Sequence, residues 1–201
     1  MSSPKKIKGV TGVILAGGAS SRMGSNKALL LHQGGRLIEK IYLTLAGLFE
    51  EVLIVTNTPE LYRFLPCRKV ADIHPGQGVM SGIHAGLAQS GESAIFVVAC
   101  DMPHLKGELI RHLVSLAEGV DVVMPVSAGG FEPVHALYRK ECLSALEELL
   151  QNADNSRMVA LLTRVRVREV PPQELTAFDP DFISFDNINT PEDYYRLRSD
   201  R

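Results

Sequence analysis

Residues Val13 to Lys27 read VILAGGASSRMGSNK, and this stretch decides the fold. It begins with an apolar run typical of a buried strand, continues through small residues and glycine, and ends with the cations Arg22 and Lys27. Glycine allows the backbone to adopt positive φ and to approach a ligand closely. Successive N–H groups in such a turn form a concavity that binds anions, and nearby cations strengthen it. The stretch therefore predicts a phosphate-binding loop that follows a strand.

Two common phosphate-binding motifs do not match this loop. A P-loop has its lysine directly after the last glycine, whereas Ser25 and Asn26 follow Gly24. The dinucleotide-binding fingerprint requires G-x-G-x-x-G, and the adjacent Gly17 and Gly18 break that spacing. The alternative is a connecting turn without a ligand. We favour a ligand because most turns between a strand and a helix have only about 2–6 residues.

The composition excludes several classes of protein. The chain has 201 residues, of which 45% are hydrophobic, and a formal net charge of −2. This length suffices for one substantial core, and the charge gives no field that would attract nucleic acid. No apolar run is long enough to cross a bilayer. The three cysteines are widely spaced without a C-x-x-C pair, which argues against zinc or redox motifs and favours a reduced, cytoplasmic protein. We predict a disordered tail over residues 1–9 and a single domain over residues 10–201.

Apolar runs of strand length alternate with segments of helical spacing. Strands are predicted at residues 10–15, 51–56, 69–71, 94–99, 120–125 and 165–170, with a further strand at one edge over 132–138. Helices are predicted at residues 36–49, 59–65, 82–89, 107–117, 140–150, 156–162 and 191–197, with Thr58, Ser81 and Thr190 as caps. The alternation predicts an α/β protein, a three-layer sandwich with a mostly parallel, Rossmann-like sheet.

Polar residues follow several of the predicted strands. The glycine-rich loop, Asn57, Asp72 and Asp101 each come after a different strand, and ligands of parallel sheets bind beyond the carboxyl ends of the strands. We therefore expect these residues to meet at one rim of the sheet. Asp101 ends the most apolar strand and suits Mg²⁺, which takes one or two carboxylates together with phosphate oxygens and water. The alternative for Asp101 is a cap of the next helix.

The other candidates at this rim have structural alternatives. Asp72 contacts the metal or a ribose hydroxyl, or it begins an Asx turn. Asn57 contacts a base edge, or it is a turn residue. Gly78 and Gly82 let a loop lie against a flat base, or they belong to a plain turn.

Three polar residues nearer the C-terminus are candidates for a second ligand. Asn187 and Asn189 point to the same side of an extended strand, which suits a polar heterocycle. The alternative is that both amides satisfy loop backbone. Arg157 either reaches a phosphate or is solvated. His135 either lines a pocket or is a structural histidine.

The pattern L-A-G-G-x-S-x-R-M-G-x-x-K resembles the signature of nucleotidyltransferases that join a nucleoside triphosphate to a phosphorylated acceptor. Within that superfamily the chain is most similar to the molybdenum cofactor guanylyltransferases. Four further segments carry this resemblance, which covers nearly the whole chain after Gly9: residues 78–82, 100–103, 132–138 and 185–193. In the first of them, Val79 stands where the family usually has proline.

The resemblance implies a nucleotide-diphospho-sugar transferase type of fold and transfer of GMP from Mg–GTP to the terminal phosphate of molybdopterin, with release of pyrophosphate. For the nucleotide, the resemblance implies that GTP is contacted by Leu15, Ala16 and Gly17, with Gly18 in the same loop, and that its phosphates are bound by Lys27 and Arg22. It implies that Asp72 contacts the nucleotide and that Asp101 contacts both the nucleotide and magnesium. For the acceptor, it implies binding by Arg157, Asn187 and Asn189. Molybdenum-insertion proteins and molybdoenzyme chaperones are the partners that it implies.

Three other activities remain open. Sister enzymes transfer CMP from CTP to molybdopterin or GMP from GTP to a cobinamide phosphate. Cytidylyl relatives usually carry alanine where this chain has Gly17, and the smaller residue favours the larger guanine base. The third alternative is not an enzyme but a non-catalytic nucleotide-binding module or chaperone. The presence of both Lys27 and Asp101 argues against it.

Overall fold

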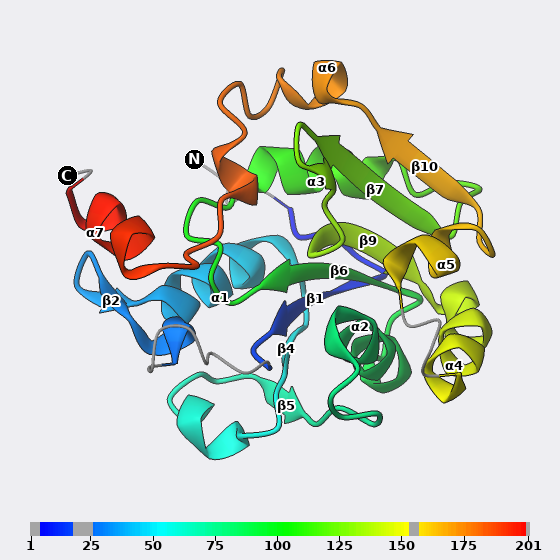
Figure 1. The fold of residues 1–201 in the computed structure, drawn as a ribbon, viewed down its shortest axis with the longest axis horizontal. Helices are drawn as coiled ribbons and strands as arrows, with labels where there is room; N and C mark the ends of the chain where they lie inside the picture. Colours follow the sequence, from blue (N-terminus) through cyan, green and yellow to red (C-terminus); the bar gives the residue numbers. More distant parts are fainter. Residues whose placement is uncertain (1–4, 18–25, 153–156, 200–201) are drawn as a thin grey trace.

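The computed structural model describes residues 5–17, 26–152 and 157–199. Its centre is an eight-stranded mixed sheet with helices on both faces (Figure 1). The strands in chain order are β1 (Val10–Leu15), β4 (Val52–Val55), β5 (Arg68–Val70), β6 (Ala94–Ala99), β7 (Val122–Ser127), β8 (Gly130–Phe131), β9 (His135–Arg139) and β10 (Val167–Val170). The strand order is β10-β7-β9-β6-β1-β4-β5, and β8 pairs with β7. The predicted three-layer α/β fold is confirmed.

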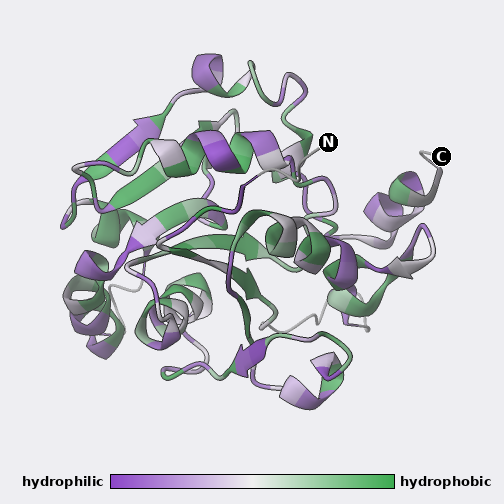
Figure 2. Cartoon of the chain, turned by 180° about the vertical axis from the view of Figure 1, so that it is seen from behind, coloured by the Kyte–Doolittle hydropathy of each residue, from purple (hydrophilic) through white to green (hydrophobic). Residues whose placement is uncertain are grey.

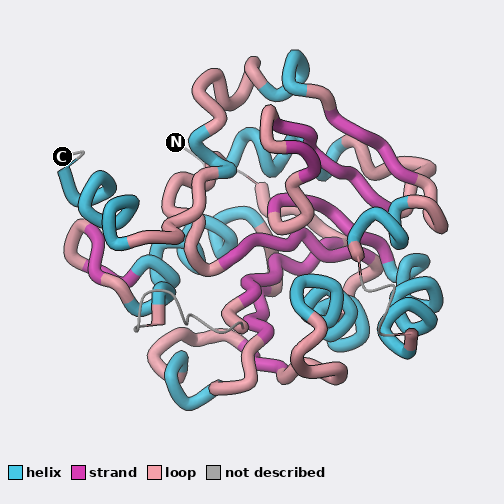
Figure 3. Tube along the Cα trace, viewed as in Figure 1, coloured by secondary structure: helices cyan, strands magenta, loops and turns pink. Residues whose placement is uncertain are grey.

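The helices divide between the two faces of the sheet. The α-helices are α1 (Leu37–Leu48), α2 (Gly78–Gln89), α3 (Gly107–Ser115), α4 (Leu143–Gln151), α5 (Met158–Leu162), α6 (Pro172–Leu175) and α7 (Pro191–Ser199). Side chains of α1 and α3 pack in one buried cluster, and those of α2, α4 and α5 pack in another. Figure 3 shows the helices arranged around the strands. No helix within the described ranges is long and apolar enough to span a membrane.

Several short elements, β8 among them, were not predicted from the sequence pattern. A hairpin of β2 (Leu31–His32) and β3 (Gly35–Arg36) precedes α1, and α6 follows β10. Single turns of 3-10 helix occur at η1 (Lys27–Leu29) and η5 (Ile183–Phe185). Elements of two to four residues are too short for hydrophobic periodicity to reveal them.

Figure 2 shows mostly hydrophobic residues in the middle of the sheet and hydrophilic residues on its edge strands. Every residue of β1 and β6 except the last is buried. The edge strands β5 and β10 read RKV and VREV, so each carries two charged residues. Charges on an edge strand discourage pairing with another chain because their burial would be costly.

The segment predicted as an edge strand lies inside the sheet. Strand β9 sits between β6 and β7 and runs antiparallel to both. The residues from His135 to Tyr138 are all fully buried. The prediction of an edge position was wrong because the position of a strand within a sheet depends on long-range pairing, here with both β6 and β7. Both faces of β9 are covered by packed side chains.

Of three predicted helix starts, those at Pro59 and Pro191 are confirmed and the one at Gly82 is wrong. Helix α2 begins at Gly78, so the buried Ser81 is a residue of its first turn and not its cap. The helix predicted at 59–65 is a 3-10 helix, η2 (Pro59–Tyr62), to which Thr58 gives no side-chain cap. In α7, Thr190 Oγ1 accepts a hydrogen bond from Asp193 N at 3.1 Å, while Asp193 Oδ2 accepts one from Thr190 N at 2.8 Å. This reciprocal cap fixes the start of the helix.

Part of the predicted N-terminal tail is attached to the core. Ile7 N donates a hydrogen bond to Leu48 O at 2.7 Å, and Ile7 pairs with Phe49 in an isolated bridge. Residues 1–4 lie outside the described ranges.

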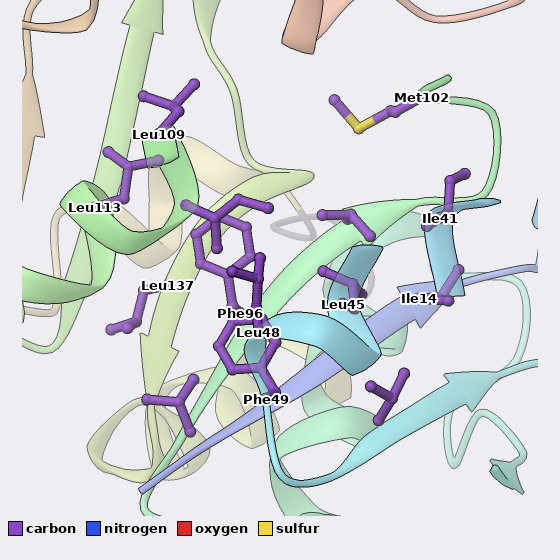
Figure 4. Close-up of a cluster of buried hydrophobic side chains, with 14 of the residues drawn as sticks. Ile14, Ile41, Leu45, Leu48, Phe49, Phe96, Met102, Leu109, Leu113 and Leu137 are labelled. Carbon is purple, nitrogen blue, oxygen red and sulfur yellow. The ribbon is translucent and has the colours of Figure 1, made fainter. Parts of the chain in front are cut away.

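The strand–helix contact under β1 depends on Gly12. Figure 4 shows Phe49 and Phe96 beside Leu45 and Leu48 in the buried cluster. The rings of Phe49 and Phe96 stack with centroids 6.1 Å apart. A Cβ atom at Gly12 would lie 2.8 Å from Phe49 Cδ2. Because this ring is fully buried, it has no free space into which it can move.

We predict that Gly12→Ala lowers the free energy of unfolding by about 1–3 kcal/mol, the usual cost of overpacking a core. Gly47→Ala is the matched control, because Gly47 is an exposed residue of α1 with no atom within 4 Å of an added Cβ. It should stabilise the protein by up to about 1 kcal/mol through helix propensity. Urea denaturation measures both. Equal stabilities of the two variants would contradict the packing argument.

Candidate active site

The carboxyl ends of four parallel strands are aligned at one rim of the sheet. Leu15 pairs with Val55 on one side and with Ala99 on the other, and Val55 pairs with Val70. The alignment continues past the strands, since Ala16 N donates to the carbonyl of Val55 at 2.9 Å. The predicted convergence of strand ends is confirmed. The residues that follow them are Gly17, Asn57, Asp72 and Asp101.

Lys27 joins two distant segments of the chain at this rim. Its Nζ lies 3.3 Å from Asp101 Oδ2 and donates a hydrogen bond to Asn189 Oδ1 at 2.8 Å. The side chains of Lys27 and Asp101 are only 15% and 16% exposed, so water screens the pair less than it would at an open surface. The C-terminal segment is held by its backbone as well, because Ile188 N donates to the carbonyl of Asp101 at 3.0 Å.

A buried methionine fixes the turn that carries Asp101. Met102 is fully buried in the cluster that also contains Ile14 and Ile41 (Figure 4). Its Sδ accepts a hydrogen bond from Ala99 N at 3.4 Å, which closes the turn after β6. Burial raises the pKa of the neighbouring Cys100 thiol to about 12, so this thiol is protonated at neutral pH.

Asn26 and Tyr62 position Lys27 from the other side. Asn26 Oδ1 accepts a hydrogen bond from Ala28 N at 3.1 Å and caps η1. Asn26 Nδ2 donates to Tyr62 Oη at 2.9 Å, and Tyr62 is 1% exposed. Sequence reasoning did not single out these two residues. An asparagine directly before Lys27 is a typical cap signal that would have indicated a helical turn there.

Asp72 is held by Asn57 at the end of β5. Asn57 Nδ2 donates to Asp72 Oδ2 at 3.3 Å, and Asp72 N donates to Asn57 Oδ1 at 3.0 Å. Burial raises the pKa of Asp72, while Asn57 and the buried hydroxyl of Ser81 act in the opposite direction. A Cβ at Gly17 would lie 3.8 Å from Asp72 Oδ2, so the glycine-rich loop begins beside this carboxylate. Asn57 therefore positions Asp72.

The two glycines predicted to line a base-binding loop belong to α2. Gly78 opens the helix with φ of +67°, a conformation that side chains other than glycine's rarely adopt. Gly82 lies within α2, where an added Cβ would come within 3.0 Å of Leu15 Cδ2. Residues 78–82 are thus helical, and the prediction that they form a loop or a plain turn is wrong. Gly82 allows α2 to pack closely against the end of β1.

The remaining predicted site residues belong to the glycine-rich loop and to the acceptor side. Gly18 and Arg22 lie outside the described residues. Arg157 is exposed just before α5, and among the described residues no hydrogen bond or ion pair joins it to Lys27, Asp101 or Asn189. Residues 186–190 form no strand, contrary to the prediction for Asn187 and Asn189.

His135 is a core residue of β9. Its side chain is fully buried, and neither ring nitrogen has a hydrogen-bond partner within the described part of the chain. The ring lies edge-on to Phe96 and Phe185, with centroid distances of 5.4 and 5.0 Å. Burial lowers the pKa of His135 to about 4, against a smaller opposing effect of Asp179. His135 is therefore a residue of the core, as the structural interpretation expected, but its ring nitrogens are not hydrogen-bonded within the described residues.

We predict that His135 makes the protein less stable as the pH falls from about 6.5 to about 4. Because the pKa of the folded state lies below that of the unfolded chain, the unfolded chain binds the proton first in this range. The cost approaches about 1.4 kcal/mol for each pH unit. Urea denaturation of wild type and His135→Leu between pH 7 and pH 5 tests this. The free energy of unfolding of the variant should depend less steeply on pH than that of wild type. Parallel plots of this free energy against pH for the two proteins would contradict the prediction.

The aligned strand ends, the glycine-rich connection after β1 and the Lys27–Asp101 pair define an α/β nucleotidyltransferase. The chain belongs to the family of MobA-like NTP transferase domains, whose model matches residues 12–168.

Named relatives and a solved structure agree with this membership. The chain is 39% identical to a probable molybdenum cofactor guanylyltransferase of Pelotomaculum thermopropionicum, over 94% of this chain and 91% of the relative. It is 38% identical to a molybdenum cofactor guanylyltransferase of Desulfosudis oleivorans, over 92% of each chain. The crystal structure of molybdopterin-guanine dinucleotide biosynthesis protein A from Archaeoglobus fulgidus superposes with a TM-score of 0.82 at 29% identity, covering 94% of this chain and 97% of that one.

Proposed function

We propose that this protein transfers GMP from GTP to the terminal phosphate of molybdopterin and releases pyrophosphate. The names of relatives with 38% and 39% identity support this choice of substrates. The observation that carries the proposal is the pairing of Lys27 with Asp101 at the rim, 3.3 Å apart and largely shielded from water. This pairing supports the proposal because it brings a cation that could bind phosphate next to a carboxylate that could bind a metal ion.

Asp101 is the residue that would hold magnesium. The described residues contain no group of three or more His, Cys, Asp or Glu side chains that could hold a metal ion on their own. One carboxylate nevertheless fits Mg²⁺, which takes one or two carboxylates and completes its coordination with phosphate oxygens and water. Bound there, the ion would neutralise charge on the triphosphate.

The chain's own residues act by positioning and by electrostatics. The ammonium of Lys27 offsets negative charge that develops on the leaving pyrophosphate, and Arg22 adds a second cation from the glycine-rich loop. The backbone of Leu15, Ala16 and Gly17 approaches the nucleotide, beside Asp72. The acceptor phosphate is already an anion, so the reaction needs no general base. Catalysis then consists mainly of in-line alignment of the two substrates.

Asn187, Asn189 and Arg157 are proposed to serve the acceptor. Asn189 is the best placed of the three, because its amide oxygen lies 2.8 Å from Lys27 Nζ and its segment bonds to the backbone of Asp101. Hand-over of the product to molybdenum-insertion proteins and molybdoenzyme chaperones, in the cytoplasm, completes the proposal.

We predict that the protein binds GTP more tightly than CTP or ATP in the presence of magnesium. Asp101→Asn should weaken GTP binding in the presence of magnesium by about tenfold or more, since it removes a charged metal ligand while it keeps the shape of the side chain. Titration calorimetry measures both effects. Asp186→Asn is the control, because this exposed carboxylate lies in the same C-terminal segment as Asn189 without touching Lys27.

Product analysis completes the test. Molybdopterin and GTP should yield pyrophosphate and a guanine dinucleotide, detected by mass spectrometry. Preference for CTP would assign the cytidylyl activity instead. Absence of magnesium-dependent nucleotide binding would refute the enzyme function.

A further inference from the structure

Lys27 has two partners of different charge, and the neutral one is closer. The distance from Lys27 Nζ to the amide oxygen of Asn189 is 2.8 Å, against 3.3 Å to the carboxylate of Asp101. Asn189 lies 162 residues further along the chain than Lys27. The contact is thus made by tertiary structure alone, and its geometry depends on how the C-terminal segment is anchored.

Three hydrogen bonds and a buried side chain hold the backbone around Asn189. Ile188 is 3% exposed, and its N–H donates to the carbonyl of Asp101. Asn189 N and Thr190 N both donate to Asp193 Oδ2, at 3.0 and 2.8 Å. These bonds lower the pKa of Asp193, so its carboxylate stays ionised at neutral pH. Asn189 is consequently presented to Lys27 from a fixed backbone.

The two partners of Lys27 differ in what they leave for a ligand. Asp101 neutralises the ammonium charge, which reduces its attraction for a phosphate. An amide oxygen orients the ammonium but leaves its full positive charge available. A lysine side chain loses considerable rotamer entropy when it is fixed, so a residue that fixes it beforehand strengthens the binding of the anion.

We propose that Asn189 is a positioning residue for the nucleotide: its amide oxygen holds the Lys27 ammonium in place for the triphosphate before any acceptor is bound. The inference rests on the proposed function and deepens it, because it gives the nucleotide half of the site a residue from the segment assigned to the acceptor. Asn187 provides the contrast. Its Nδ2 donates to the carbonyl of Phe185 at 3.1 Å, and in the described residues it has no bond to Lys27.

The experiment is titration calorimetry of Mg–GTP without acceptor on the full chain. Asn189→Ala should weaken GTP binding about threefold to tenfold, which corresponds to the net contribution of an ordinary hydrogen bond. Asp186→Ala, a change in the same segment at a residue with no proposed role in the site, should leave this binding unchanged. The side chains of Asn189 and Asp186 are both exposed, so both variants should fold, and thermal denaturation checks that they do.

A double-mutant cycle separates positioning from a general effect on the structure. If Asn189 acts through Lys27, then Asn189→Ala should have no further effect in the Lys27→Ala background. A merely structural role would weaken binding equally in both backgrounds, and that result would overturn the proposal. Unchanged or tighter GTP binding by Asn189→Ala would overturn it too.

The outcomes also distinguish this inference from the proposed function. If wild type binds GTP and Asp101→Asn weakens the binding but Asn189→Ala does not, only the inference about Asn189 fails. If wild type binds no GTP, the proposed function and the inference fail together.

Discussion

The parallel register of β1 between β4 and β6 is the constraint on which the site depends. Because Leu15 is level with Val55 and Ala99, the chain leaves all three strands at the same height. A shift by one residue would turn every side chain of β1 to the opposite face of the sheet and bring a residue with a side chain against Phe49 in place of Gly12. Gly12 belongs to the same constraint, since it permits α1 and Phe49 to lie close under the strand.

The C-terminal segment completes the rim through a buried ion pair. Asp179 is fully buried, yet its Oδ1 lies 2.9 Å from Lys106 Nζ and its Oδ2 accepts a hydrogen bond from Ser184 N at 2.8 Å. Burial alone would raise the pKa of Asp179, but the bonds from Lys106 and Ser184 lower it below its ordinary value. The carboxylate therefore remains charged and anchors the chain that continues to Asn189.

The sequence predicted the parts of the fold that periodicity controls. Apolar runs located β1, β4 and β6, and the rule that ligands bind at strand ends placed Asp72 and Asp101 at one rim. Prediction from the sequence pattern failed where tertiary packing determines the position of an element. Nothing local in residues 132–138 indicates insertion between two strands, and the buried Ser81 looked like a cap because serine is a common cap residue.

Contacts within the site were predictable only in part. Capping of α7 by Thr190 follows from a local pattern, and the structure confirms it. The contact of Lys27 with Asn189 joins residues 162 positions apart, so no local pattern could indicate it. The support of Lys27 by Asn26 and Tyr62 likewise depends on the path of the chain between β4 and β5.

The interior position of β9 also dictates an order of assembly. Strands β1, β4, β5 and β6 pair only with one another up to residue 99, so this half of the sheet can form as soon as that length of chain has left the ribosome. Strands β7, β8 and β10 are joined to it only through β9. Strands β7 and β8 pair with each other directly, but they join the first half of the sheet only once β9 has been added along β6. Until then the edge of β6 that β9 covers has no strand to pair with, and unpaired strand edges favour aggregation.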